Sequence, residues 1–424
     1  MSRGDRAEDS RSGTPLDDGH PRVAYIMSRF PKLTETFILY EILAMEGSGV
    51  RVELYPLLRE REAIVQPEAV ALVERAHYLP FISMAILRSQ LHFLRRRPRA
   101  YLRALRDVIR GTWGSLNFLG GALGIFPKVA HAARLMAEDR ITHVHCHFAS
   151  HPAAAGFIIQ RLTGITYSFT AHGSDLHVDR HMLCEKVAEA AFVVPISDYN
   201  RQLILTECGE QWRDKLVVIH CGVETSMFRP AERPRNQAFT IISVGTLHEV
   251  KGQTFLVEAC RQLAEAGIDF VCRLIGDGAD RAALVRQARD AGVGDRIRFE
   301  GQRTRGEIAE ALRQSDVLVT PSVPTAGGKR EGIPVVLMEA MSSGIPVVAS
   351  ELSGIPELVE DGVSGLLVPP RDATGLASAL RRLHDEPQLG QRLGSAGREK
   401  VRREFDVATN AAALARRFTR VEAA

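Results

Sequence analysis

Two glutamates, Glu331 and Glu339, stand eight residues apart in the glycine- and proline-rich segment GGKREGIPVVLMEAMSSGIPVVAS, residues 327–350. Pro334 suits the start of a helix, because its missing N–H would have no partner inside the helix. The first N–H groups of a helix lack intrahelical partners and, together with the helix dipole, bind anions such as a diphosphate. The groups exposed here would belong to Val335, Val336 and Leu337.

The two carboxylates suit a ligand that carries hydroxyls beside its phosphates. Glu339 would lie about one and a half turns into the helix, with its side chain tilted toward the helix N-terminus. A carboxylate placed there can accept hydrogen bonds from both hydroxyls of a ribose, as in dinucleotide sites. Glu331, at the mouth, could hold sugar hydroxyls, and Gly332 allows close backbone approach. The alternative is that these acids are only favourable charges near a helix N-terminus.

Short apolar runs alternate with helical stretches from residue 22 to about residue 370. The strands predicted in the first half lie at 23–27, 51–57, 141–148, 164–170, 191–197 and 215–220. Those predicted in the second half lie at 239–245, 270–276, 296–301, 317–322, 346–350 and 365–370. Such alternation, with near-continuously apolar strands, indicates parallel sheets covered by helices on both faces. The predicted fold class is α/β, with two doubly wound, Rossmann-like domains facing a cleft lined by the strands' carboxyl ends.

The polar, proline-bearing stretch at 229–237 has the composition of a linker. It separates a first domain at 21–222 from a second at 238–395, and we expect the terminal helices at 396–424 to return to the first domain. Residues 1–20 are polar and indicate a disordered tail rather than a signal peptide. Because no apolar run reaches the roughly eighteen residues that span a bilayer, we expect a cytoplasmic protein.

The amino-acid composition excludes few further classes of protein. The 424 residues are 45% hydrophobic and 25% charged, which is ordinary for a globular protein. A net charge of +3 gives no global signal for nucleic acid, and no nucleic-acid partner is expected. The scattered cysteines include no C-x-x-C pair, which favours buried, reduced thiols over disulfides. They are Cys146, Cys184, Cys208, Cys221, Cys260 and Cys272.

Residues 80–137 form an insert without a strand pattern, which we expect to be helical. The insert contains one acidic residue, Asp107, and many arginines: Arg88, Arg95, Arg96, Arg97, Arg99, Arg103, Arg106 and Arg110. The apolar residues interleaved with them are Phe81, Ile86, Leu87, Leu91, Phe93 and Leu94. A basic amphipathic helix can lie on an anionic membrane surface, which would make the protein peripheral on the inner face of the cytoplasmic membrane. The alternative is a solvated face over packed helices.

The segment from Glu331 to Ala349 resembles, without gaps, the mark of the family 4 retaining glycosyltransferases of the GT-B fold. That mark is a pair of glutamates followed by EAM, a small residue, G-x-P and an apolar strand. The opening SRFPKLTETFILYEI, at 28–42, is similar to those of transferases that build bacterial exopolysaccharides such as colanic acid. The resemblance covers most of residues 22–400.

The resemblance implies an enzyme that moves a sugar from a nucleoside-diphosphate sugar, of UDP or GDP type, to a saccharide acceptor. The acceptor would bind in the first domain and the donor in the second. Retention of the anomeric configuration, with the leaving diphosphate as base, is also implied. The basic insert suggests that the acceptor is lipid-linked. No cofactor is expected beyond the donor.

The family's donor contacts map onto several loops of the second half. In SVGTLHEVKGQ, at 243–253, Lys251 would neutralise donor phosphates beside Gly245. The family's usual arginine after this glycine is Thr246 here, and Lys329 or Arg330 could replace it. The other donor residues that the resemblance implies are Gly276, Arg303, Gly332, Ile333, Pro334, Val335, Val336 and Glu339.

The catalytic residues implied by the resemblance are Glu331 and His172, the latter in SFTAHGSDLHV at 168–178. His172 would either bond a sugar hydroxyl or present its backbone carbonyl to the developing oxocarbenium charge, and both remain open. Asp175 follows in the same pattern. Glu35 would lie near the diphosphate, at a helix start that Thr34 can cap. His147 is expected on the acceptor side, with Glu35 and Asp175.

A metal site is not expected. His143, His145 and His147 alternate onto one strand face, but successive positions there are about 6.8 Å apart, too far for all three to bind one zinc. The sequence also has no Asp-x-Asp motif. A nicotinamide dehydrogenase would need G-x-G-x-x-G after the first strand, which is missing. The alternative that stays open is a non-catalytic nucleotide-sugar-binding protein of the same fold.

Overall fold

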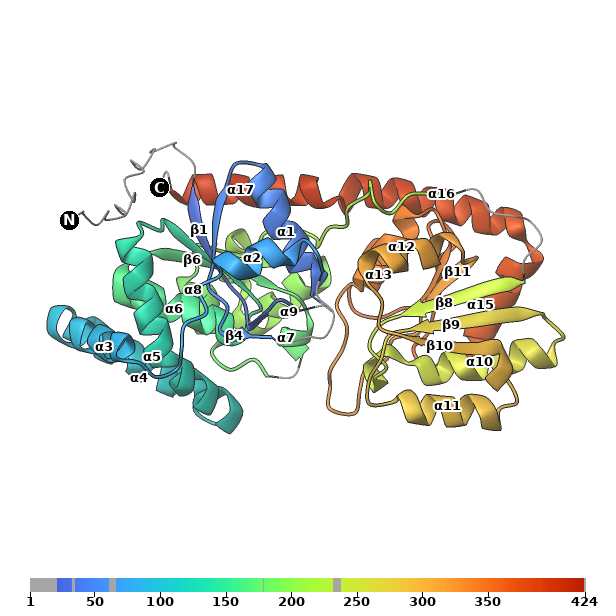
Figure 1. The fold of residues 1–424 in the computed structure, drawn as a ribbon, viewed down its shortest axis with the longest axis horizontal. Helices are drawn as coiled ribbons and strands as arrows, with labels where there is room; N and C mark the ends of the chain where they lie inside the picture. Colours follow the sequence, from blue (N-terminus) through green and yellow to red (C-terminus); the bar gives the residue numbers. More distant parts are fainter. Residues whose placement is uncertain (1–20, 33–34, 61–65, 178, 232–237, 423–424) are drawn as a thin grey trace, which may run out of the picture.

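Two parallel sheets organise the computed structural model, which describes residues 21–32, 35–60, 66–177, 179–231 and 238–422. The first sheet has the order β3 (Arg51–Leu54), β1 (Arg22–Ile26), β5 (His143–His147), β6 (Thr166–Ala171), β7 (Phe192–Pro195). The second has the order β10 (Ile297–Gly301), β9 (Phe270–Ile275), β8 (Phe239–Val244), β11 (Val317–Thr320), β12 (Val347–Ser350), β13 (Leu366–Val368). The predicted pair of doubly wound α/β domains is confirmed (Figure 1).

Helices cover both sheets. Those of the first half are α1 (Thr36–Gly47), α2 (Ala69–Arg75), α3 (Met84–Arg96), α4 (Pro98–Thr112), α5 (Leu116–Glu138), α6 (His151–Thr163), α7 (Ser174–His177), α8 (Leu183–Glu189) and α9 (Asp198–Cys208). Those of the second half are α10 (Gln253–Glu265), α11 (Arg281–Asp290), α12 (Arg305–Arg313), α13 (Val335–Ser342), α14 (Ile355–Leu358), α15 (Ala373–Asp385), α16 (Pro387–Glu404) and α17 (Val407–Glu422). Two short strands, β2 (Arg29–Phe30) and β4 (Leu58–Arg59), pair separately.

The strand order reverses beside the first strand of each sheet. Strand β1 lies between β3 and β5, and β8 lies between β9 and β11. In open parallel sheets, ligands bind in the crevice that such a reversal leaves at the carboxyl ends of the strands. The loops that follow β1, β5, β8 and β11 are therefore where a site is expected.

The last two helices run along one side of both domains (Figure 1). Helix α16 packs against α13 in the second domain, and α17 packs against α1 and β5 in the first. The ring of Phe418, in α17, lies 6.4 Å from that of Tyr25 and 5.3 Å from that of His143, measured between centroids. The C-terminal helix thus completes the core of the first domain.

One predicted strand, at 215–220, is wrong. The segment forms a single isolated bridge, between Leu216 and Val193. The N–H of Val217 donates to the Val193 carbonyl at 2.9 Å, and that of Ile219 donates to the Pro195 carbonyl at 3.3 Å. The segment lies at the edge of the sheet beside β7, so it has a partner on one side only and leads into the linker.

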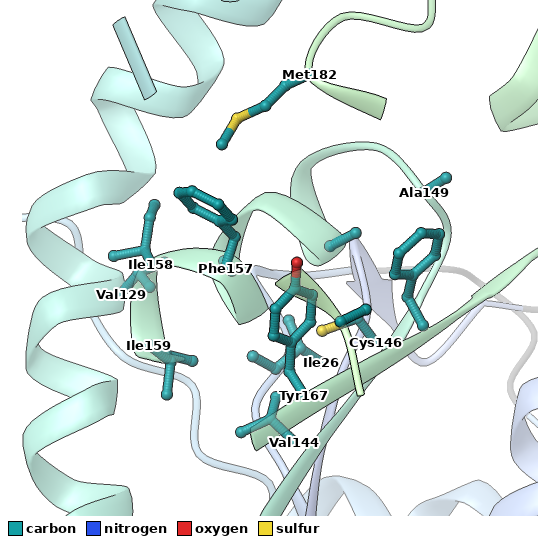
Figure 2. Close-up of a cluster of buried hydrophobic side chains, with 14 of the residues drawn as sticks. Ile26, Val129, Val144, Cys146, Ala149, Phe157, Ile158, Ile159, Tyr167 and Met182 are labelled. Atoms are coloured by element: carbon teal, nitrogen blue, oxygen red, sulfur yellow. The ribbon is translucent and has the colours of Figure 1, made fainter. Parts of the chain in front are cut away.

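The helical insert has one buried side and one exposed side. Helix α5 packs against α6, which lies on the sheet. Figure 2 shows Val129 of α5 beside Ile158 of α6, with the ring of Phe157 turned toward Met182. Helices α3 and α4 pack outside α5 and α6, at the end of the molecule farthest from the second domain (Figure 1). None of the helices in the described ranges combines the length and the hydropathy of a membrane span.

The prediction that all six cysteines are buried thiols is wrong for two of them. Cys184 of α8 and Cys208 of α9 form a disulfide, with their Cα atoms 5.0 Å apart. Both are half-buried. The two helices are neighbours in space, which the 24-residue separation does not reveal. Cys146, Cys260 and Cys272 are buried as free thiols, and Cys221 is a half-buried one.

Three histidines of β5 form a buried polar layer under α17. The nitrogens of His143 lie 2.8 and 2.7 Å from the hydroxyls of Thr166 and Ser168. Burial lowers the pKa of His143 to about 3 and that of His145 well below its usual value. These rings therefore stay neutral in the folded chain, whereas they take up protons in the unfolded chain below about pH 6.5.

Acidification below pH 6.5 is therefore expected to destabilise the fold. For His143 alone the loss is about 2 kcal/mol at pH 5, because each pH unit between the folded and unfolded pKa is worth about 1.4 kcal/mol. Urea unfolding at pH 7.5 and pH 5 measures this loss. His143→Gln should show a smaller loss between these pH values. An equal loss in the variant would contradict the assignment to His143.

Candidate active site

The cleft between the domains holds two adjoining cavities of about 270 and 290 Å³. Of the predicted site residues, the first cavity is lined by Gly245, Lys251, Gly276, Arg303, Glu331, Ile333, Pro334, Val335, Val336 and Glu339. The second is lined by Glu35, His172, Lys251, Glu331, Gly332, Ile333, Pro334 and Val335. Motifs that lie far apart in the sequence thus converge on one place in the fold.

The N-terminus of α13 opens into both cavities. Pro334 is the residue before its first turn, with φ −63° and ψ 126°. The N–H of Leu337 donates to the Pro334 carbonyl at 3.1 Å, so the prediction that it points into the cleft is wrong. The N–H groups of Val335 and Val336 remain at the helix start, where no carbonyl of the same helix can reach them. Of the three backbone N–H groups predicted to face a ligand, only those of Val335 and Val336 therefore remain without a partner in the helix.

An ion pair crosses the boundary between the two cavities. Lys251 Nζ bonds to one carboxylate oxygen of Glu331, and the Ser322 hydroxyl donates to the other. Both charged side chains line both cavities. Close by, Gly276 has φ +135°, and a Cβ there would lie 1.9 Å from the Gly245 carbonyl oxygen. The turns at Gly245 and Gly276 are therefore in backbone contact, and no side chain from either glycine enters the cavity beside Lys251.

Glu339 lies deep in the first cavity. Its carboxylate is almost fully buried, and its Oε1 is 3.9 Å from Nε of Arg305. Burial raises the pKa of Glu339 to about 7, although the charge of Arg305 lowers it. This carboxyl group therefore changes its charge near neutral pH, and a ligand that donates hydrogen bonds would favour the ionised form.

Arg305 is a site residue that the sequence did not reveal. Its guanidinium carbon lies 3.6 Å from the centroid of Tyr40, in α1 of the first domain, and its Nη1 lies 3.1 Å from Oε2 of Glu224. Its Nε is buried without a hydrogen-bond partner. The predicted Arg303 is more exposed and pairs with Glu307. The two arginines are two residues apart in one turn, and no sequence pattern tells which side chain points inward.

The cleft is also lined by Thr246, Lys329 and Arg330, the three residues considered above in connection with the family's arginine. Thr246, which occupies its position, lines both cavities. Lys329 and Arg330, the suggested replacements, line the second cavity. Nη1 of Arg330 lies 3.4 Å from the Tyr199 hydroxyl of the first domain. Two cations are thus present beside the ion pair of Lys251.

The first domain contributes His172 and the start of α1. The imidazole of His172 packs against both Phe37 and Phe148, with ring centroids 4.6 and 4.7 Å away. Glu35 lines the second cavity at the residue before α1, which begins at Thr36 rather than at Glu35. Thr34, the predicted cap, lies outside the described residues. Contacts with these two aromatic rings hold the ring of His172 at the cavity wall.

His147 and Asp175 stand behind that wall rather than on it. His147 is fully buried, and its Nδ1 lies 3.1 Å from Nε2 of His172. The carboxylate of Asp175 accepts hydrogen bonds from the N–H groups of Ala149 and His172, at 2.6 and 3.0 Å. Neither residue lines the two cavities. Both therefore act on the cleft through the loops and rings that they hold.

One group of potential metal ligands occurs among the described residues: Glu41, His145 and His147, with ligand atoms within 4.8 Å of one another. His143, which the sequence pattern groups with them, is not part of it. Both ring nitrogens of His145 already pair with hydroxyls, those of Ser168 and Thr170, at 2.8 and 3.0 Å. The ligands of one tetrahedral zinc lie only about 3.4 Å apart. The group is therefore better suited to hydrogen bonding.

The two domains come close enough here to exclude side chains. A Cβ on Gly332 would lie 2.5 Å from the His172 carbonyl oxygen. A second tie is Glu357 of the second domain, whose carboxylate accepts 2.8 Å hydrogen bonds from the N–H groups of Asp198 and Tyr199, at the start of α9. Glu357 thus caps a helix of the opposite domain.

Two protein families match this chain. Residues 225–400 match the family described as Glycosyl transferases group 1, and residues 34–227 match Glycosyltransferase Family 4. The chain is 32% identical to a protein of Escherichia coli K12 named for colanic acid biosynthesis, the glycosyltransferase WcaL, over 91% of this chain and 96% of that protein. It is 38% identical to the amylovoran biosynthesis glycosyltransferase AmsK of Erwinia amylovora, over 55% of this chain and 59% of AmsK.

Solved structures share the fold. Anabaena Alr3699/HepE, in complex with UDP and glucose, superposes with a TM-score of 0.71 at 18% identity, over 94% of this chain and 99% of that one. Sucrose-phosphate synthase from Thermosynechococcus elongatus superposes with a TM-score of 0.68 at 19% identity, over 93% and 98%. Two Rossmann-like domains around such a cleft make up the GT-B fold. The chain belongs to glycosyltransferase family 4, within the group that serves exopolysaccharide biosynthesis, and the predicted enzyme class is confirmed.

Gly332→Ala is expected to force the domains apart, because its Cβ would collide with the His172 carbonyl. Such overpacking destabilises a fold by about 1–3 kcal/mol. Thermal unfolding and the radius of gyration from small-angle scattering measure both effects. Gly306→Ala is the matched control, since a Cβ there meets nothing within 4 Å. Identical curves for the two variants would show that the domains do not meet at Gly332 in solution.

Proposed function

We propose that the enzyme transfers a sugar from a nucleoside-diphosphate sugar, of UDP or GDP type, to a saccharide acceptor. The observation that carries this proposal is the convergence in one cavity of the α13 N-terminus, Lys251 and the buried Glu339. The helix start and Lys251 would hold the diphosphate, and Glu339 would accept hydrogen bonds from the ribose hydroxyls. Glu331 would hold hydroxyls of the transferred sugar. The UDP and glucose named for Alr3699/HepE support a donor of this kind.

Donor binding is proposed to need no metal ion. Lys251, Lys329 and Arg330 bring three positive charges to the cavities, in addition to the helix end. Cations and a helix N-terminus together can neutralise a diphosphate in a partly desolvated site. No cofactor other than the donor takes part in the proposed reaction.

The proposed reaction retains the anomeric configuration. The leaving diphosphate takes the proton of the acceptor hydroxyl, and the new glycosidic bond forms on the face from which the diphosphate departs. The close approach of the two domains supports the exclusion of water, which would otherwise hydrolyse the donor. The coupling constant of the anomeric proton in the product distinguishes retention from inversion.

Nucleotide binding in the presence of EDTA tests the donor site. Calorimetry at pH 8, where Glu339 is ionised, compares UDP, GDP and ADP. One of them should bind, and Glu339→Gln should weaken it about tenfold or more, because charge-assisted hydrogen bonds to the ribose are lost. Wild-type affinity should also fall below pH 7, whereas that of the variant should not.

The matched control is Glu310→Gln, an exposed carboxylate on α12. It should bind the nucleotide as the wild type does. If no nucleotide binds without metal, or if Glu339→Gln binds as tightly as Glu310→Gln, the proposed donor site is wrong.

We also propose that the insert docks on anionic lipid, which would bring the enzyme to a lipid-linked acceptor. Ile82 and Leu116 are 93% and 90% exposed. The other exposed large apolar side chains of the insert are Phe81, Met84, Leu87, Leu91, Leu94, Leu102, Trp113 and Leu123. The eight predicted arginines are all exposed, whereas Ile86 and Phe93 turn inward. Apolar groups flanked by cations suit an anionic membrane surface.

Charge reversal tests this docking. Arg95→Glu, Arg96→Glu and Arg99→Glu together should reduce binding to phosphatidylglycerol vesicles by about a hundredfold, since each basic residue contributes about 1 kcal/mol. Arg97 is left unchanged because it donates to the carbonyls of Leu162 and Thr163.

The control carries the same charge change on the second domain: Arg381→Glu, Arg382→Glu and Arg402→Glu, all at exposed positions. It should keep vesicle binding, and both triple variants should keep nucleotide binding. Equal losses of vesicle binding in the two variants would show a non-specific charge effect and contradict docking through the insert.

A further inference from the structure

Four polar side chains form a continuous chain from α1 to the wall of the second cavity. Oε1 of Glu41 lies 3.3 Å from Nε2 of His147, and Nδ1 of His147 lies 3.1 Å from Nε2 of His172. Nδ1 of His172 lies 3.6 Å from Sγ of Cys221. His172 and Cys221 line the second cavity, whereas His147 is fully buried behind them.

The donors and acceptors in this chain can be assigned in sequence. An ionised carboxylate only accepts hydrogen bonds, and a neutral imidazole has one donor and one acceptor nitrogen. No hydrogen bond joins Nε2 of His147 to Glu41, but the carboxylate oxygen 3.3 Å away favours a proton on Nε2 over a lone pair, which leaves Nδ1 as the acceptor. His172 must then donate from its Nε2, which leaves the lone pair on its Nδ1. The thiol of Cys221 is the donor that faces this lone pair.

The surroundings support this assignment. The hydroxyl of Tyr25 donates to the same Glu41 oxygen at 3.0 Å, so this oxygen already serves as an acceptor. Burial, reinforced by the neighbouring His147, lowers the pKa of His172 well below its usual range, so the ring is neutral. Burial also raises the pKa of Cys221, so its thiol keeps the proton.

The other polar groups nearby do not compete for the chain. His145 packs beside His147 but has both ring nitrogens paired with the hydroxyls of Ser168 and Thr170. The carboxylate of Asp175 bonds the backbone N–H of His172 and not its ring. The tautomer of His172 therefore depends on Glu41 and His147.

We propose that Glu41 and His147 are positioning residues, which hold His172 as the Nε2–H tautomer and present its Nδ1 lone pair to a sugar hydroxyl in the second cavity. A thiol is a weak donor, so a hydroxyl can replace Cys221 at Nδ1 without turning the ring. This role rests on the proposed function, because it takes the ligand of the second cavity to be a sugar. Of the two roles considered for His172, the proposal takes the hydrogen bond from a sugar hydroxyl to the ring, and not the role of the backbone carbonyl.

The tautomer is measured directly by ¹⁵N NMR of the histidine side chains in the substrate-free enzyme. In the wild type, His172 should carry its proton on Nε2. His147→Phe keeps a ring in place but removes the acceptor, so His172 should become a mixture of tautomers. The kcat of this variant should fall about ten- to hundredfold, as for other residues that orient a ligating histidine, with a smaller change in the KM for the donor.

Three further variants separate positioning from packing. Glu41→Gln keeps a carbonyl that can accept from His147 and should retain more activity than Glu41→Leu. Cys221→Ala removes only the last partner and should keep the Nε2–H tautomer. His143→Phe is the control for a buried ring on the same strand, and it should leave the spectrum of His172 unchanged.

Several results would overturn the proposal. They are an Nδ1–H tautomer in the wild type, an unchanged tautomer in His147→Phe, or a metal ion retained by Glu41 and His147 after dialysis. The NMR spectrum is recorded without substrate, so its outcome does not depend on whether the enzyme binds a nucleotide. Failure of UDP and GDP to bind would remove the proposed function while leaving the tautomer result intact.

Discussion

The contact between the His172 carbonyl and Gly332 fixes the separation of the two domains. A methyl group does not fit there, since its carbon would lie 2.5 Å from the oxygen. Because backbone meets backbone, the α13 N-terminus and the ring of His172 are held on opposite walls of one cleft. Other ties cross the same boundary, from Glu357 to the start of α9, from Arg305 to Tyr40 and from Arg330 to Tyr199. The cleft therefore depends on a few local contacts.

Two cations of the cleft are partnered with carboxylates of the cleft. Lys251 faces Glu331, and Arg305 faces Glu339. Each pair joins a cation, which suits phosphate, to a carboxylate, which suits hydroxyls. A ligand that offers both chemistries can take over both partners at once, whereas inorganic phosphate would leave a carboxylate without its cation. Since an unpaired buried charge is expensive, the pairing itself discriminates among ligands.

The alternation of strands and helices, and the segment from Glu331 to Glu339, could be predicted because they are written in adjacent residues. The predictions that failed concern contacts that form only when the chain folds. The disulfide of Cys184 and Cys208 requires α8 to lie against α9, and the bond from the Leu337 N–H requires a tight first turn. Arg305 acquires its place from Tyr40, more than 250 residues earlier in the chain. Periodicity alone carries no such information.

The return of α17 to the first domain has a consequence for biosynthesis. Phe418 of α17 covers Tyr25, His143 and His145, so the histidine layer stays open until α17 has been synthesised. The second domain, by contrast, has all its strands by Val368. Domains usually fold in the order of their synthesis. Here the strands of the later domain can be in place first, while the earlier domain waits for α17 to cover its core.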